Sequence, residues 1–259
     1  MQKKKLKISV ISQIHYGKLI LRSLLLIAAL AAYIVSHLNG SGSMFGGYDS
    51  VWIWIAVLAI YAVEMVLRCF PSDYESMGCQ KQFPQNYRPT GVSAPQMQPW
   101  TRTFAAAAAW LLLNGTIGVL YRVKLIGKDI LILISLAYGV CDMICILFFC
   151  PFQTWFMKNR CCAVCRIYNW DFAMMFTPYL FIPNGYTWSL LGMSLLLLLR
   201  WEITVHRHPE RFAENTNAAL SCKKEKIHPF ADPYRPGKGW MPKIQITLCS
   251  SQLPRRKRR

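Results

Sequence analysis

The chain has 259 residues, of which 54% are hydrophobic and only 16% are charged, yet its formal net charge is +18. A soluble domain usually has about 25% charged residues, so this composition excludes a disordered chain and an ordinary soluble surface. High apolar content combined with excess positive charge favours a polytopic membrane protein with basic ends over a nucleic-acid-binding protein with a large core.

Five long apolar runs contain most of the hydrophobic residues, at 19–38, 51–67, 104–121, 130–150 and 172–201. A membrane-spanning helix needs about 20 mostly apolar residues. Pro183-Asn184-Gly185 is a turn signal inside the last run, so this run is expected to form a short fifth helix and a sixth helix over 186–201. The first run is full length and lacks a small-residue cleavage site, which predicts a span and not a cleaved signal peptide.

The sequence therefore predicts an all-α, polytopic integral membrane protein with about six transmembrane helices, the fifth being short or re-entrant. Residues 1–222 are expected to form the transmembrane domain with its loops. Residues 223–259 carry eleven Lys or Arg and two acidic residues, a net charge of +9. They are expected to form a disordered basic tail, because they lack the apolar surface that folding requires.

The orientation follows from Lys and Arg, which are enriched in cytoplasmic loops. They occur before the first run and in the loops 68–103 and 151–171, whereas the loop 39–50 has none. Both termini are therefore expected in the cytoplasm, with the protein in the plasma (inner) membrane. The third loop disagrees, since Arg122, Lys124 and Lys128 would lie outside. The expected partners are the bilayer and anionic lipid at the basic loops and tail, with no nucleic acid; protein partners are not indicated.

The ten cysteines are the most informative residue type. None lies in a loop assigned to the outside, where a disulfide framework would be expected. This distribution favours metal ligation or thiol chemistry. Cys162 and Cys165 form a CxxC pair, whose two thiolates can hold one tetrahedral ion. A complete site needs about four ligands, and the candidates on the predicted cytoplasmic face are Cys69, Cys79, Cys161, Cys162, Cys165 and Cys222.

Zinc is the favoured metal, in a structural or sensory role, because the repeated cysteine run of bacterial ferredoxins is absent. His206 and His208 are further possible ligands or simply solvated residues. The alternative is a membrane redox protein in which Cys150 joins the cysteines at 161, 162 and 165 to hold an iron–sulfur cluster or to exchange disulfides. The simplest alternative is that these cysteines are small buried residues or lipidation targets.

Three polar residues, Glu64, Asn114 and Asp142, fall inside predicted spans, where such groups are functional candidates by default. Glu64 is expected to pair with Arg68 one turn later. Asp142 either hydrogen-bonds a neighbour such as Asn114 or, with Cys141 and Cys145, forms the cation site of a small transporter. No nucleotide-binding, hydrolase or zinc-protease motif is present, so the sequence assigns no enzymatic activity.

Overall fold

The computed structural model describes residues 10–40, 49–159 and 161–220, and helices dominate this part of the chain. The described residues contain no strand, and their one isolated bridge is an antiparallel pairing of Pro89 with Asn217. The prediction of an all-α fold is therefore confirmed. The basic tail 223–259 and Cys222 lie outside the described residues.

Five helices are long: α1 (Val10–Leu38), α2 (Asp49–Leu67), α4 (Trp100–Arg122), α5 (Lys128–Leu147) and α7 (Gly185–Arg207). Of these, α1, α4, α5 and α7 are each long and apolar enough to cross a membrane. In α2, the part from Val57 to Leu67 forms a shorter apolar helix. The structure thus contains four candidate membrane spans among its described residues.

The helix α5 ends at Leu147, before the predicted end at Cys150. Cys150 precedes Pro151, and the residue before a proline is sterically biased away from the helical conformation. Phe148 already has a non-helical backbone, with φ of −124° and ψ of −65°. Cys150 is therefore a residue of the following loop and not of the span.

The fifth apolar segment is a composite of two short helices, as the sequence predicts for a short element. The helix α6 (Asp171–Phe176) continues directly as the 3-10 helix η5 (Thr177–Phe181). Pro178 lies at the start of η5, and a proline has no N–H with which to continue α-helical bonding. The chain then turns at Asn184, whose side chain accepts a hydrogen bond from the backbone N–H of Tyr186 and caps α7.

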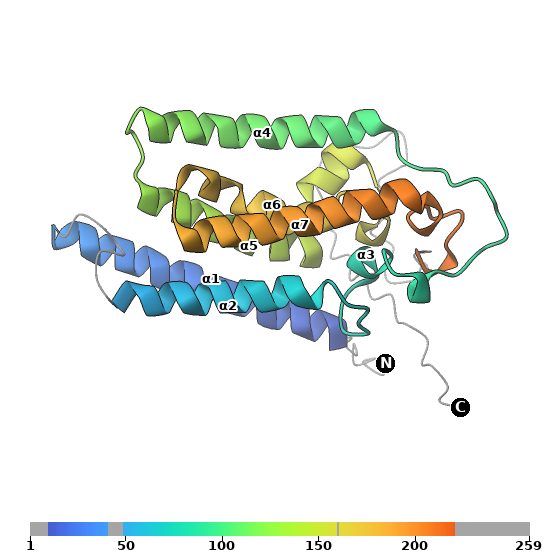
Figure 1. Cartoon of the computed structure of the whole chain (residues 1–259), viewed down its shortest axis with the longest axis horizontal. Helices are drawn as coiled ribbons and strands as arrows, with labels where there is room; N and C mark the ends of the chain where they lie inside the picture. Colours follow the sequence, from blue (N-terminus) through green and yellow to red (C-terminus); the bar gives the residue numbers. More distant parts are fainter. Residues whose placement is uncertain (1–9, 41–48, 160, 221–259) are drawn as a thin grey trace, which may run out of the picture.

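The helices α1 and α4 run in one direction and α2, α5 and α7 in the other, so that their ends gather at the two ends of the molecule (Figure 1). Arg22 of α1 contacts Asp142 of α5, and Tyr16 lies edge-on to Phe148, so α1 and α5 run antiparallel. Residues 68–99, 148–159, 161–170 and 208–220 all lie at one end, on the right in Figure 1. We call this the loop-rich end.

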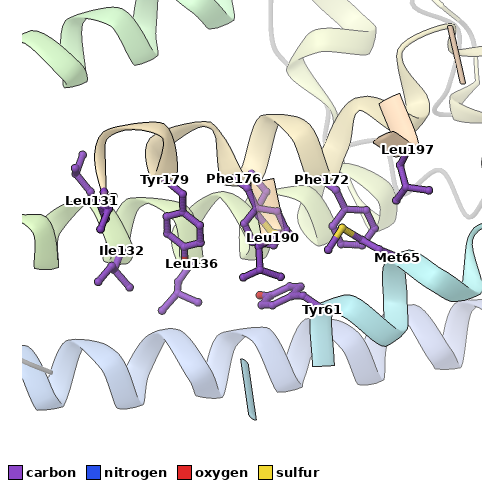
Figure 2. Close-up of a cluster of buried hydrophobic side chains, with 12 residues drawn as sticks. Tyr61, Met65, Leu131, Ile132, Leu136, Phe172, Phe176, Tyr179, Leu190 and Leu197 are labelled. Atoms are coloured by element: carbon purple, nitrogen blue, oxygen red, sulfur yellow. The ribbon is translucent and has the colours of Figure 1, made fainter. Parts of the chain in front are cut away.

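The main core lies around α6 and η5, which are packed between α2, α5 and α7 (Figure 2). Phe172, Phe176 and Tyr179 form a row of buried rings, and Tyr61 of α2 meets Phe176 edge-on at 5.3 Å. In contrast, α1 and α4 expose large apolar side chains, including Phe104 at 74%. An outer surface of this kind suits contact with lipid.

Candidate functional site

Two of the polar residues predicted inside spans, Glu64 and Asp142, belong to one buried ionic cluster. Arg22, which is 2% exposed, donates to Glu64 at 2.6 Å and to Asp142 at 2.9 Å. Its guanidinium also donates to the backbone carbonyl of Gly139 at 3.0 Å. We call Arg22, Glu64 and Asp142 the ionic cluster. It joins α1, α2 and α5, and it offsets the desolvation of each charge by pairing it.

The expected pair between Glu64 and Arg68 is wrong. Arg68 donates instead to Asn169 at 2.9 Å and to Asp171 at 2.7 Å, and thereby connects the end of α2 to the start of α6. The expected bond between Asp142 and Asn114 is also not the one observed, because Asn114 donates to the carbonyl of Trp110 in its own helix. The sequence gives only spacing along one helix, whereas these partners come from helix packing.

The proposed transport trio is divided between two environments. The carboxylate of Asp142 faces Arg22, whereas Cys141 is exposed on α5. Cys145 contacts Cys150 instead of completing a cation site. The three side chains therefore do not converge on one centre.

Two of the predicted metal ligands have other partners. The thiol of Cys69 lies 3.7 Å from the carbonyl of Met65 in the preceding turn of α2. Cys79, in the short helix α3 (Met77–Gln80), is 1% exposed and donates to the carbonyl of Ser76 at 3.2 Å. Burial raises the pKa of Cys79 to about 12. This thiol stays protonated at neutral pH, and only the thiolate is a strong ligand or nucleophile.

Three of the remaining candidates, Cys161, Cys162 and Cys165, belong to the loop between α5 and α6. Cys161 is disulfide-bonded, contrary to the expectation that cysteines at this end avoid disulfides. Cys162 and Cys165 flank the single turn η3 (Cys162–Val164), and Cys222 lies outside the described residues. Across the described ranges, no group of three or more His, Cys, Asp or Glu side chains is arranged to hold a metal ion. Zinc and iron–sulfur binding therefore stay predictions.

A buried lysine supports this loop. Lys81 is fully buried, and its amine donates to the carbonyls of Ala163 at 2.8 Å and Cys165 at 2.7 Å. The amine also lies over the rings of Trp201 and Phe212, at 5.4 and 5.5 Å from their centroids. Desolvation lowers the pKa of Lys81 to about 8. Lys81 thus fixes the CxxC turn to the end of α7.

Cys145 and Cys150 form a pair of interacting thiols. Cys145 lies in the last turns of α5, and Cys150 follows the helix just before Pro151. The Cys145 thiol interacts with the Cys150 sulfur, and both residues are reduced and half-buried. We call these two residues the membrane-edge dithiol, because they lie where a candidate span meets the loop-rich end.

The Cys150 sulfur is also surrounded by backbone donors. The backbone N–H of Gln153 donates to it at 3.4 Å. The interaction with Cys145 together with the neighbouring backbone N–H groups lowers the pKa of Cys150 against the opposing effect of burial. A thiol whose pKa is lowered in a partly exposed position has the properties of a reactive cysteine.

Sequence reasoning placed these two cysteines in different hypotheses, with Cys145 in a cation site and Cys150 in a redox cluster. It gave no role to Lys81 or Gln153, because nothing in their neighbouring residues indicates which distant groups they contact. The Cys-Pro pair at 150–151 was the one available signal, since it marks where the helix must end. No protein-family model, curated protein or solved structure matches the chain. Function is therefore argued from the geometry alone.

Proposed function

We propose that the protein is a multi-pass membrane protein that carries out thiol–disulfide exchange, with Cys145 and Cys150 as its reactive dithiol. The observation that carries this proposal is the placement of two reduced, interacting thiols at the edge of a candidate span, with the backbone N–H of Gln153 donating to the Cys150 sulfur at 3.4 Å. The lowered pKa of Cys150 identifies it as the attacking sulfur, and Cys145 is then placed to resolve the intermediate,.

The proposed topology has six membrane segments. Four helices meet the length and hydropathy of a span, and α2 and the composite α6–η5 lie beside them. The excess of Lys and Arg in the loops 68–103 and 151–171 supports placing the loop-rich end in the cytoplasm,. Thiols are kept reduced in that compartment, which suits a dithiol whose task is to reduce other disulfides.

The proposed reaction is a pair of exchange steps. The Cys150 thiolate attacks a disulfide in a substrate protein or peptide, forms a mixed disulfide and releases one substrate thiolate. Cys145 gives its proton to solvent, attacks the Cys150 sulfur and releases the second substrate thiolate. The substrate gains two electrons, and Cys145 and Cys150 are left as a disulfide. A cytoplasmic dithiol reductant returns the pair to its starting state.

Trapping the mixed disulfide tests this proposal. Full-length protein in lipid nanodiscs is mixed with a disulfide-bonded model peptide, quenched by alkylation and mapped by mass spectrometry. Cys145→Ser should accumulate peptide on Cys150, because the resolving thiol is missing, whereas Cys150→Ser should accumulate none. Cys141→Ser, which alters an exposed thiol one turn from Cys145, is the matched control and should behave as wild type. Equal trapping in Cys150→Ser would contradict the proposal.

Zinc binding is a second proposed function, and it rests on the CxxC spacing of Cys162 and Cys165. Its remaining ligands would include Cys222, outside the described residues. Metal analysis of anaerobically purified protein tests it: about one zinc per chain, lost in Cys162→Ser/Cys165→Ser, supports the proposal. A brown protein containing iron would favour the iron–sulfur alternative, and a metal content that ignores the double substitution would exclude both ligand assignments.

A further inference from the structure

We infer that the membrane-edge dithiol exchanges disulfides directly with a second dithiol, Cys162 and Cys165, through contact between Cys150 and Cys162. This inference rests on the proposed function, because it requires Cys145 and Cys150 to form a disulfide. It assigns the CxxC pair to a relay within the chain.

One residue touches both sulfurs. The backbone N–H of Gln153 donates to the Cys150 sulfur at 3.4 Å, and its side-chain Oε1 accepts from the Cys162 thiol at 2.7 Å. The other side-chain atom of Gln153, Nε2, donates to the carbonyl of Asn159 at 3.2 Å. The backbone N–H of Asn159 donates to the carbonyl of Gln153 at 3.1 Å. Gln153 is thus held in place between the two thiols.

The backbone explains why residues twelve positions apart meet. After Pro151 the chain forms the short π-helix η2 (Phe152–Met157), which ends at Lys158. Lys158 has a left-handed backbone with φ of 50°, a conformation that non-glycine residues rarely adopt. This conformation reverses the chain, so that the η3 turn returns to the start of η2. The turn therefore delivers Cys162 to Gln153.

The CxxC turn has the form that a second dithiol needs. The backbone N–H of Cys165 donates to the carbonyl of Cys162 at 3.0 Å, which closes one 3-10 turn. Residues three apart in such a turn lie within the roughly 4.4–6.8 Å between Cα atoms that a disulfide requires. Cys162 is half-buried, whereas Cys165 is buried. Cys162 is therefore the accessible member and Cys165 the resolving one.

Charge supports the same division of roles. Burial raises the pKa of Cys165 to about 11, and the nearby Lys81 amine opposes this rise. The Lys81 amine also fixes the turn through the Ala163 and Cys165 carbonyls. A thiolate that forms on Cys165 during exchange would thus face a fully buried cation. Lys81 is a positioning residue for the second dithiol.

The transfer balances as two exchange steps. The Cys162 thiol loses its proton to solvent and attacks the Cys150 sulfur of the Cys145–Cys150 disulfide, which forms a Cys150–Cys162 disulfide and releases Cys145 as a thiolate. Cys165 loses its proton and attacks the Cys162 sulfur, which releases Cys150 as a thiolate. Two electrons pass from the CxxC pair to the membrane-edge dithiol, and the disulfide moves the opposite way.

Timed disulfide mapping of full-length protein in nanodiscs tests the relay, with oxidised glutathione as the disulfide donor. In wild type, the Cys145–Cys150 disulfide should appear first and the Cys162–Cys165 disulfide second. Cys165→Ser should accumulate the Cys150–Cys162 disulfide, and Cys150→Ser should slow formation of the Cys162–Cys165 disulfide at least tenfold. Tandem mass spectrometry is needed, because Cys161 lies beside Cys162.

A positioning variant provides a second readout, since a buried Cys165→Ser substitution could unfold the loop. Gln153→Ala should delay the second disulfide without delaying the first, and Cys141→Ser should change neither. Formation of the Cys162–Cys165 disulfide at the wild-type rate in Cys150→Ser would overturn the relay and leave the proposed function intact. Absence of a Cys145–Cys150 disulfide in wild type would overturn the proposed function itself.

Discussion

Two polar regions of this protein treat buried positive charge in opposite ways. In the ionic cluster between α1, α2 and α5, Arg22 is bound by two carboxylates, Glu64 and Asp142. At the loop-rich end, the equally buried Lys81 is bound by two backbone carbonyls. Among the described residues, Lys81 forms no ion pair with a carboxylate. The groups near Lys81 that can become anions are thiols, Cys165 foremost.

This difference suggests a structural role for the ionic cluster and a role in thiol chemistry for the region around Lys81. The ionic cluster already pairs its cation with two carboxylates from other helices, so its residues are expected to hold helices together. The region around Lys81 can accept a negative charge, which a thiolate would supply. Asp142 and Cys145 lie one turn apart on α5, yet one faces Arg22 and the other faces Cys150. We therefore expect substitutions in the two regions to fail in different ways.

The largest expected effect is the loss of Arg22. Arg22→Met leaves two carboxylates inside the spans without their cation, and removing one partner of a buried ion pair typically destabilises a protein by about 3–5 kcal/mol. Denaturant unfolding in detergent micelles measures this loss. The triple variant Arg22→Met/Glu64→Gln/Asp142→Asn removes all three charges and should recover most of the stability. A triple variant no more stable than Arg22→Met would contradict the idea that the loss of stability comes from unpaired carboxylates.

The second effect is a dependence of stability on pH that Lys81 confers. Its pKa falls to about 8 in the folded chain, whereas an unfolded lysine titrates near 10.4. Between these values the unfolded chain binds more protons, so the lysine term makes stability rise with pH. As the pH rises through this interval, the free energy of unfolding of wild type should increase by about 3 kcal/mol relative to that of Lys81→Met, because each pKa unit corresponds to about 1.4 kcal/mol.

Paired unfolding curves of wild type and Lys81→Met at pH 7.5 and 10.5 measure this gain. The comparison between variants matters, because the buried Cys79 and Cys165 thiols have raised pKa values and oppose the trend at alkaline pH. A parallel response of both proteins would mean that Lys81 is not desolvated.

The smallest effect concerns the reactivity of Cys150. Cys145→Ala removes the thiol whose interaction lowers the pKa of Cys150, so alkylation of Cys150 should require a higher pH. Cys145→Ser retains a donor at the same position and should keep the lower midpoint. Mass spectrometry of the Cys150 peptide after pulses of iodoacetamide gives the rate at each pH. Identical midpoints in the alanine and serine variants would show that Cys145 does not lower the pKa of Cys150.

The sequence predicted the helices well, because their signals are local. The turn at Pro183-Asn184-Gly185 correctly divided the last apolar run, and α7 begins at Gly185. The partners of Glu64 and Arg68 could not be predicted in this way. Their positions one turn apart made a pair within α2 the simplest expectation, but helix packing brings Arg22 and Asp171 closer.

The candidate site was predictable only in part. Its cysteines were identified, but their grouping depends on where α5 ends and on the reversal at Lys158, which leads the chain back to Cys150. A positive φ at a lysine is not signalled by residue type, since glycine is the usual residue there. Contact between Cys145 and Cys150 likewise depends on the chain leaving the helix before Pro151.

A redox titration of the membrane-edge dithiol tests the central claim most directly. Full-length protein in nanodiscs is equilibrated with glutathione buffers of defined ratio, and the oxidised fraction of Cys145 and Cys150 is read by differential alkylation. The account predicts that both residues oxidise together in one two-electron transition, with a slope of about 30 mV per tenfold change, and that Cys141→Ser leaves it unchanged. Independent oxidation of the two cysteines, or glutathione adducts in place of an internal disulfide, would contradict it.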